Sequence, residues 1–153
     1  AFYIGEKKMN IHNSDIKLVF GVDNGSKPMD ISYGAKPKIG IINKRCKNVS
    51  RLTSKWIHIL LNEALKGKKK DDNEEVTQLV CMYACQKLFF STSGEIIGWD
   101  YYAHMVPLET MQEYDWAKQI RTTLTSSISQ NDKKLAKVTG CVILLMVSIH
   151  VVK

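Results

Sequence analysis

Apolar residues recur at helical spacing in four stretches of the chain. They lie three or four positions apart, so each stretch presents one continuous apolar face if it is helical. The pattern predicts four main helices, at residues 50–66, 74–90, 115–129 and 133–152. Glycine, proline and short polar residues separate these stretches, which is typical of the connections between helices.

The stretch from Val76 to Gly94 is at the centre of this pattern. Apolar side chains surround most of its predicted helix, which is typical of a helix in the core. Asp72 and Glu75 have the spacing of a capping box, which favours a helix start there. The Ser-Thr-Ser-Gly sequence at residues 91–94 predicts the helix end, because small hydroxyl residues compete for backbone hydrogen bonds and glycine adopts turn geometry freely.

The helices at 50–66 and 115–129 are predicted to be amphipathic. Ser50 is the expected N-cap of the first and Asp115 that of the second. The expected buried face of the first helix comprises Leu52, Trp56, Ile59 and Leu60. In the second helix the apolar residues recur every four positions, at Trp116, Ile120, Leu124 and Ile128. Shorter helical turns are expected at residues 99–105 and 108–113.

Residues 1–49 predict a loop-rich region. Residues 14–20 fit either a short helix capped by Ser14 or an alternating strand, and Gly21 at the stop position favours the helix. The Asn-Gly pair and the prolines of residues 22–49 predict turns, with one short strand possible at 38–42.

The apolar run Val138–Val152 is 15 residues long, and a membrane-spanning helix needs about 20. Thr139, Gly140, Ser148 and His150 interrupt it. We therefore expect a buried helix and no membrane span.

The whole pattern predicts a mainly α fold, an irregular bundle of about four main helices. We expect a single helical domain over residues 1–153, with a loop-rich basic region at 1–49 and a helical core at 50–153. The chain begins without Met and ends directly after an apolar run. This leads us to expect a fragment of a longer protein.

Charge is distributed unevenly between the two halves. Residues 1–70 contain 15 Lys/Arg and 5 Asp/Glu, whereas residues 71–153 contain 7 and 10, and the formal net charge is +7. The basic half suits a polyanionic partner such as nucleic acid, or it solvates an irregular surface. The run KGKKKDDNEE at residues 66–75 predicts an exposed loop, because its acids offset its lysines.

Four cysteines and four histidines are the candidates for metal or thiol chemistry. Cys81 and Cys85 lie on the same side of one predicted helix, and His58 or His104 could complete a metal half-site through tertiary contact. Structural zinc sites use tighter spacings, and no second ligand pair follows. We expect buried free thiols, with no metal site and no cysteine nucleophile.

Other catalytic motifs are absent from the sequence. The chain contains neither a phosphate-binding P-loop nor a dinucleotide-binding glycine fingerprint. The carboxylates that could serve acid–base chemistry lie mostly at predicted turns and caps: Glu95, Asp100, Glu109, Glu113 and Asp115. We therefore expect no enzyme activity, no catalytic residues and no cofactor.

Three pieces of sequence together resemble a known family: residues 19–25 (VFGVDNG), residues 88–94 (LFFSTSG), and YDWA at 114–117 followed by TGCVILL at 139–145. Their order is similar to a plant-specific helical domain of unknown function in mobile-element-derived proteins, found upstream of SUMO-type cysteine peptidase domains or related to the plant mobile domain. The similarity covers most of residues 14–150.

The resemblance implies an accessory module of a larger transposon-derived plant protein, nuclear or cytoplasmic, with any peptidase residues beyond Lys153. It supplies no catalytic motif for this chain. The leading expectation is a non-catalytic protein-interaction or scaffolding module. The alternative is a nucleic-acid-binding accessory domain that uses the basic N-terminal half.

Overall fold

A computed structural model describes residues 2–4, 6–32, 34–67, 70–131 and 134–151. The fold is mainly α-helical, with two short antiparallel strand pairs, β1–β2 and β3–β4. The elements follow in the order β1 (Phe2–Ile4), β2 (Lys7–Met9), α1 (Asn13–Phe20), α2 (Gly40–Arg45), β3 (Leu52–Thr53), α3 (Ser54–Ala64), α4 (Lys70–Ala84), the π-helical turn η1 (Cys85–Phe89), β4 (Ile96–Ile97), α5 (Trp99–Ala103), α6 (Leu108–Met111), α7 (Trp116–Gln130), the 3-10 turn η2 (Leu135–Lys137) and α8 (Ile143–Val151).

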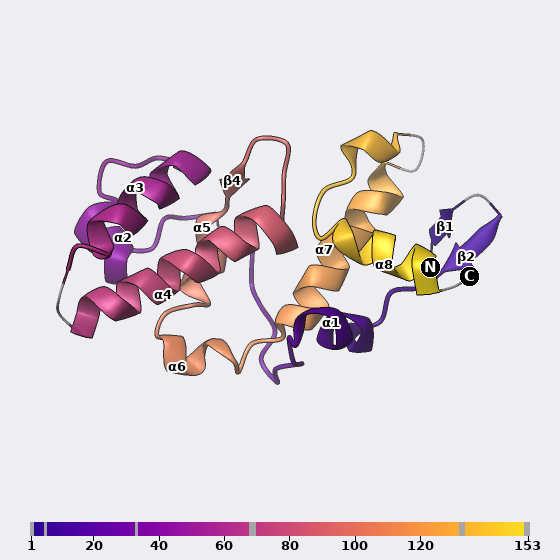
Figure 1. The fold of residues 1–153 in the computed structure, drawn as a ribbon, viewed down its shortest axis with the longest axis horizontal. Helices are drawn as coiled ribbons and strands as arrows, with labels where there is room; N and C mark the ends of the chain where they lie inside the picture. The colour runs from indigo at the N-terminus through magenta and orange to yellow at the C-terminus, as the bar shows by residue number, and fades with distance from the viewer. Residues whose placement is uncertain (1, 5, 33, 68–69, 132–133, 152–153) are drawn as a thin grey trace.

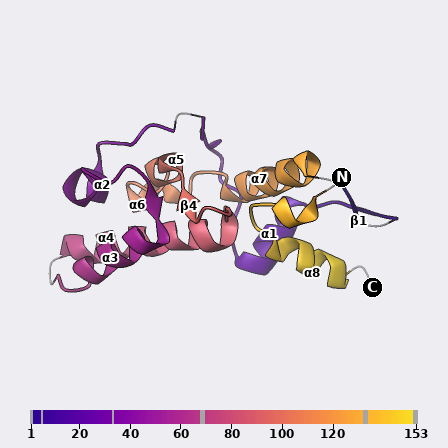
Figure 2. The same ribbon diagram turned by 90° about the horizontal axis from the view of Figure 1, so that it is seen from above.

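The elements form two groups along the long axis of the molecule (Figures 1 and 2). One group contains α2 to α6, and α4 is its longest helix. The other contains α1, α7, α8 and the β1–β2 hairpin. The loop between α1 and α2 and the segment between α6 and α7 connect the two groups, so residues far apart in the sequence meet at their junction.

The predicted central helix is present as α4 followed by η1. Leu79, Met82 and Cys85 are buried on its inner side. Its outer side is more exposed than predicted, since Val80 is 50% exposed. The backbone N–H of Phe90 donates to the carbonyl of Cys85 at 2.7 Å, which closes a wider π-type turn at the helix end.

This wider turn accompanies a buried polar side chain. Gln86 is 1% exposed, and its Oε1 accepts a 2.9 Å hydrogen bond from the Ser54 hydroxyl. Its Nε2 donates to the carbonyls of Leu52, at 3.4 Å, and Glu95. Gln86 therefore joins η1 to the β3–β4 pair, and burial costs little because its polar atoms have partners.

Helix α3 begins later than predicted, because Leu52 and Thr53 pair with Ile97 and Ile96 as strands. Its N-cap is Thr53 rather than Ser50, since the Thr53 hydroxyl accepts from the N–H of Trp56 at 3.4 Å. The buried face also differs from the predicted one. The fully buried positions of the helix are Ser54, Ile57, Leu60 and Ala64, whereas Trp56 and Ile59 are 41% and 37% exposed.

In the N-terminal region the helix at residues 14–20 is confirmed as α1. Gly21 ends it in the left-handed conformation, with φ +69°, and its N–H donates to the Lys17 carbonyl at 2.8 Å. The N-cap is His12 rather than Ser14. The short strand predicted at residues 38–42 is wrong, because α2 begins at Gly40 and buries Ile41 and Ile42.

Helix α7 is confirmed nearly as predicted. Asp115 caps it, with Oδ1 accepting from the N–H of Lys118 at 2.9 Å. The residues with period four, Trp116, Ile120, Leu124 and Ile128, are all buried. The short turns predicted before it are also present, as α5 and α6.

The single helix predicted at residues 133–152 is wrong, because the chain breaks near Gly140. Gly140 has φ +94°, and its N–H donates to the Ser91 carbonyl at 2.9 Å while the Ser91 hydroxyl donates to its carbonyl at 2.7 Å. Among the described residues of this stretch, only η2 and α8 are helical. Among the described residues, no helix combines the length and apolar character needed to cross a membrane.

Two predictions fall partly on residues outside the described ranges. Lys68 and Lys69 belong to the loop predicted at 66–75, and Lys133 and Val152 belong to the helix predicted at 133–152. Within the described part, α4 already begins at Lys70, so the capping box at Asp72 and Glu75 is not a helix start.

Candidate functional site

The segment around α2 is the most basic part of the chain. Residues 31–62 contain seven Lys/Arg and no Asp or Glu. The fold separates these cations into an inner group, which contacts acids from α3 and α4, and an outer group, which remains at the surface.

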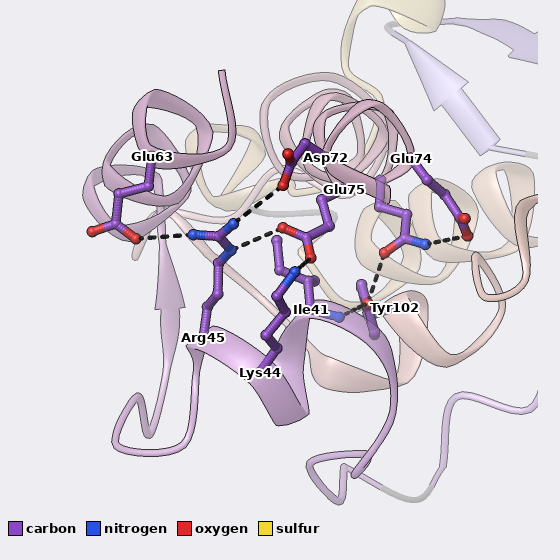
Figure 3. Close-up of polar contacts among 9 residues, drawn as sticks. Ile41, Lys44, Arg45, Glu63, Asp72, Glu74, Glu75 and Tyr102 are labelled. Atoms are coloured by element: carbon purple, nitrogen blue, oxygen red, sulfur yellow. Dashed lines mark hydrogen bonds and ion pairs between the residues drawn. The ribbon is translucent and has the colours of Figure 1, made fainter. Parts of the chain in front are cut away.

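Lys44 and Arg45 form the inner group (Figure 3). Lys44 Nζ lies 2.6 Å from Glu75 Oε1, and Arg45 Nε lies 2.8 Å from Glu75 Oε2. Further guanidinium nitrogens of Arg45 lie 3.7 Å from carboxylate oxygens of Glu63 and Asp72. Asp72 and Glu75 are buried, at 8% and 7% exposure, so these contacts compensate the burial of their charge.

A separate chain of hydrogen bonds links α2 to α5 and α4 (Figure 3). The N–H of Ile41 donates to the Tyr102 hydroxyl at 2.9 Å, and this hydroxyl donates to Gln78 Oε1 at 2.8 Å. Gln78 Nε2 donates in turn to Glu74 at 3.1 Å. Burial raises the pKa of Tyr102 to about 12, so the phenol stays protonated near neutral pH. These groups satisfy one another and position α2.

Lys36 organises the loop that follows α2. Its Nζ donates to the carbonyls of Lys47, at 3.0 Å, and Val49, at 2.9 Å, and also to that of Cys46. The same Nζ lies 5.3 Å from the centroid of the Trp99 ring, which is cation–π geometry. The Trp99 indole N–H donates to the Ser50 carbonyl at 3.2 Å. One lysine and one tryptophan therefore fix residues 46–50.

The outer cations lie around this loop. A cavity of about 320 Å³ is lined by Lys36, Pro37, Lys38, Ile42, Asn43 and Lys47, without any acid. Lys38 and Lys47 are exposed, as are Arg51 and Lys55. In the described part of the chain, no carboxylate forms an ion pair with any of these four.

An exposed aromatic side chain belongs to the same region. Trp56, Ile59 and Glu63 lie at i, i+3 and i+7, and therefore on one side of α3. Glu63 contacts Arg45, which identifies this side as the one next to α2. We define the α2 basic surface as Lys38, Lys47, Arg51, Lys55 and Trp56.

A cavity of about 580 Å³ lies at the junction of the two groups of elements. It is lined by Gly21, Val22, Asp23, Leu108, Glu109, Met111, Gln112, Tyr114 and Trp116. The lining contains two acids and no base, although the chain carries a net charge of +7. We call this cavity the junction cleft.

Hydrogen bonds from distant segments hold the walls of the junction cleft. The N–H of Lys27 donates to the Glu113 carbonyl and that of Asp115 to the Lys27 carbonyl, both at 2.8 Å. The Trp116 indole donates to the Met111 carbonyl at 2.8 Å. Asp23 forms an exposed ion pair with Lys17. Glu109 is also exposed, and it forms no ion pair with a cation of the described residues. The cleft thus combines a fixed apolar floor with carboxylates at its surface.

The thiols considered for catalysis or metal binding are free cysteines inside the fold. Cys46, Cys85 and Cys141 are buried, and Cys81 is partly buried. Burial raises the pKa of all four thiols, that of Cys141 to about 11, and the neighbouring Cys81 raises that of Cys85 further. Nucleophilic attack requires the thiolate, which these environments disfavour.

The histidines occupy separate environments. His58 is exposed, with its ring edge-on to Tyr83 at 5.1 Å between centroids. His104 Nδ1 lies 2.7 Å from the Asp100 carbonyl, and its Nε2 accepts from the N–H of Asp30 at 3.2 Å. His12 is at the start of α1, and the side chain of His150 lies outside the described part. No group of three or more His, Cys, Asp or Glu residues in the described ranges could hold a metal ion.

Most carboxylates considered for acid–base chemistry have structural contacts. Glu95 lies 2.6 Å from Lys87, whose hydrogen bond lowers the pKa of the Glu95 carboxyl. Glu113 forms an ion pair with Lys27, and Asp115 caps α7. Glu109 is the one of these that lines the junction cleft.

One family of known sequences matches the chain. Its description is "Domain of unknown function (DUF8566)", and the match covers residues 1–146. The chain belongs to this family. No curated protein and no solved structure matched the chain.

The DUF8566 match includes every residue of the junction cleft and of the α2 basic surface. Sequence reasoning identified neither of them as a site. The acid-free run at residues 31–62 is a signal that could have located the basic surface. The cleft has no comparable signal, because its residues come from positions 21–23 and 108–116.

Proposed function

We propose that this DUF8566 chain is a non-catalytic protein-interaction or scaffolding module that binds its partner in the junction cleft. The observation that carries the proposal is the acidic and apolar lining of the junction cleft in a basic protein. Its volume of about 580 Å³ is in the range of ligand sites. A basic, partly apolar peptide segment complements such a lining in both charge and polarity.

The burial of three thiols, the partial burial of Cys81 and the separation of His12, His58 and His104 support a non-catalytic role. A nucleophile would require a base within hydrogen-bond distance. A cleft with a fixed floor and surface carboxylates suits recognition without covalent chemistry.

We further propose, from the resemblance of residues 19–25, 88–94, 114–117 and 139–145, that the module is part of a transposon-derived plant protein in the nucleus or cytoplasm. The full reading frame on both sides of residues 1–153 tests this. A neighbouring cysteine peptidase or transposition-related domain supports it, and a frame without either contradicts it.

Peptide titration followed by NMR tests binding in the cleft. We expect a peptide of alternating Lys and Leu to shift the amide signals of Asp23, Glu109 and Met111, and a matched Glu–Leu peptide to leave them unchanged. Each exposed charge contributes little, so the double variant Asp23→Asn/Glu109→Gln should weaken binding about fivefold.

The matched control Glu6→Gln/Glu95→Gln removes the same charge away from the cleft and should bind normally. Equal binding of both peptides, or shifts confined to other surfaces, contradicts the cleft. Turnover of a ubiquitin-like precursor by the protein contradicts the non-catalytic role.

A second candidate is a nucleic-acid-binding accessory function of the basic N-terminal half. The observation that favours it is the α2 basic surface within an acid-free run of 32 residues, 31–62. Binding to nucleic acid at low salt, with affinity falling steeply as salt increases, is the expected result. Absence of binding at low salt contradicts it.

A further inference from the structure

The exposed cations of the α2 basic surface differ from Lys44 and Arg45, the cations of α2 that contact acids of α3 and α4. Lys17, Lys27, Lys44, Arg45 and Lys87 each form an ion pair with a carboxylate. Lys38, Lys47, Arg51 and Lys55 form none with the described carboxylates. Lys44 and Arg45 pair with the nearby acids of α4. These acids therefore do not neutralise the α2 basic surface, which keeps a concentrated positive charge.

The loop that carries Lys47 and leads to Arg51 is held in place from inside. Lys36 binds three backbone carbonyls of the loop, and Trp99 holds the Ser50 carbonyl. The contact with Lys47 uses its backbone carbonyl, so the Lys47 side chain remains available to a ligand. A preorganised loop loses less conformational entropy when its side chains bind an anion.

Trp56 adds an exposed aromatic ring to the side of α3 next to α2. It is 41% exposed, whereas Trp99 and Trp116 are buried at 7% and 6%. An exposed aromatic ring beside cations is the combination with which proteins bind single-stranded nucleic acid, because bases stack on the ring while cations contact the phosphates.

We propose that the α2 basic surface is a binding site for single-stranded nucleic acid. This inference rests on the second candidate function and specifies its site and ligand. Lys38 and Lys47, which line the cavity of about 320 Å³, contact backbone phosphates together with the exposed Arg51, and a base stacks on Trp56. A single strand fits better than a duplex, because its base faces are free for stacking.

Fluorescence anisotropy with labelled dT12 and rU12 and with a 12-base-pair duplex tests the site. We expect the single strands to bind at least fivefold more tightly than the duplex at low salt. Trp56→Ala should weaken single-strand binding about tenfold while leaving the salt dependence unchanged, because stacking releases no counterions.

The triple variant Lys38→Ala/Lys47→Ala/Arg51→Ala should reduce affinity at least tenfold. It should also reduce the slope of log K against log salt by about 2, since each phosphate contact on a single strand contributes about 0.7. The matched control Lys8→Ala/Lys118→Ala/Lys134→Ala removes three exposed cations elsewhere and should change affinity less than twofold at the same salt concentration. Circular dichroism verifies that each variant is folded.

Three results would overturn the proposal in distinguishable ways. Absence of binding to every nucleic acid at low salt removes the second candidate function as well. Binding that the control variant weakens more than the α2 variants assigns it to another surface. Tighter binding to the duplex, or binding only to vesicles containing phosphatidylserine, identifies a different polyanion as the ligand.

Discussion

At the scale of single residues, the fold depends on side chains and glycines whose partners are distant in the sequence. Gln86 is 1% exposed and bonds to Ser54 and to the β3–β4 pair. Lys36 uses its ammonium group on backbone carbonyls rather than on a carboxylate. Such buried polar groups are tolerated because each has partners, and removal of one partner leaves the other unsatisfied.

Gly140 provides a test at this scale. An added Cβ would lie 3.3 Å from Leu124 N and Cα, and φ +94° is strained for any side chain. We expect Gly140→Ala to lower the free energy of unfolding by about 2 kcal/mol in urea denaturation. The control Gly21→Ala also has positive φ but meets no atom within 4 Å, and about 1 kcal/mol is expected there. Equal losses would show that packing against Leu124 is unimportant.

At the scale of elements, local signals determine some helix ends and long-range contacts determine others. The Asp115 cap and the Gly21 stop are local, and both are where the sequence places them. The start of α3 is different, because pairing of Leu52 and Thr53 with β4 delays it. The break before α8 likewise depends on the bonds between Ser91 and Gly140.

The cap of α7 leads to a prediction about helix stability. Asp115→Ala removes the acceptor of the Lys118 N–H, and we expect a loss of about 1 kcal/mol in urea denaturation. Asp115→Asn keeps an acceptor oxygen and should stay within a few tenths of a kcal/mol of the original protein. If both variants lose the same stability, the charge and not the cap is responsible.

The connection between α2, α4 and α5 is tested by Tyr102→Phe. This change leaves the Ile41 N–H and Gln78 Oε1 without the Tyr102 hydroxyl as a hydrogen-bond partner. We expect the free energy of unfolding to fall by about 1–3 kcal/mol. In a double-mutant cycle, the loss in Tyr102→Phe/Gln78→Leu should be smaller than the sum of the single losses. Strict additivity would contradict a direct bond between the two side chains.

At the scale of the whole molecule, buried ionisable groups make stability depend on alkaline pH. Burial raises the pKa of Cys141 from 9.0 to about 11, and that of Tyr101 and Tyr102 from 10.0 to about 12. Above pH 9 the unfolded chain releases protons that the folded protein retains. High pH therefore favours the unfolded state.

We expect the urea midpoint to be unaffected by these groups below pH 9 and to fall progressively from pH 9 to 12. Cys141→Ala removes one of these groups, so the urea midpoint of this variant should fall less between pH 9 and 11. A midpoint that stays constant up to pH 11 in the original protein would contradict the retention of these protons.

The two candidate sites show how far sequence reasoning reaches at this scale. The sequence shows an excess of cations before residue 70, but it does not show which of these cations remain at the surface. Lys44 and Arg45 lie within three positions of Lys47 in the sequence. Even so, Lys44 and Arg45 form ion pairs with Glu75 and Asp72 of α4, whereas Lys47 does not. The junction cleft requires residues about 90 positions apart, which no local pattern relates.

The sequence by itself determined the mainly helical class, the period-four face of α7 and the stops at Gly21 and after Phe90, because capping and periodicity act over one or two turns. Only the tertiary structure decided the start of α3, the break at Gly140, the exposure of Trp56 and the pairing of the inner cations. These features depend on contacts between residues tens of positions apart. A short segment of sequence does not contain both partners of such a contact, so its free energy cannot be inferred from local patterns.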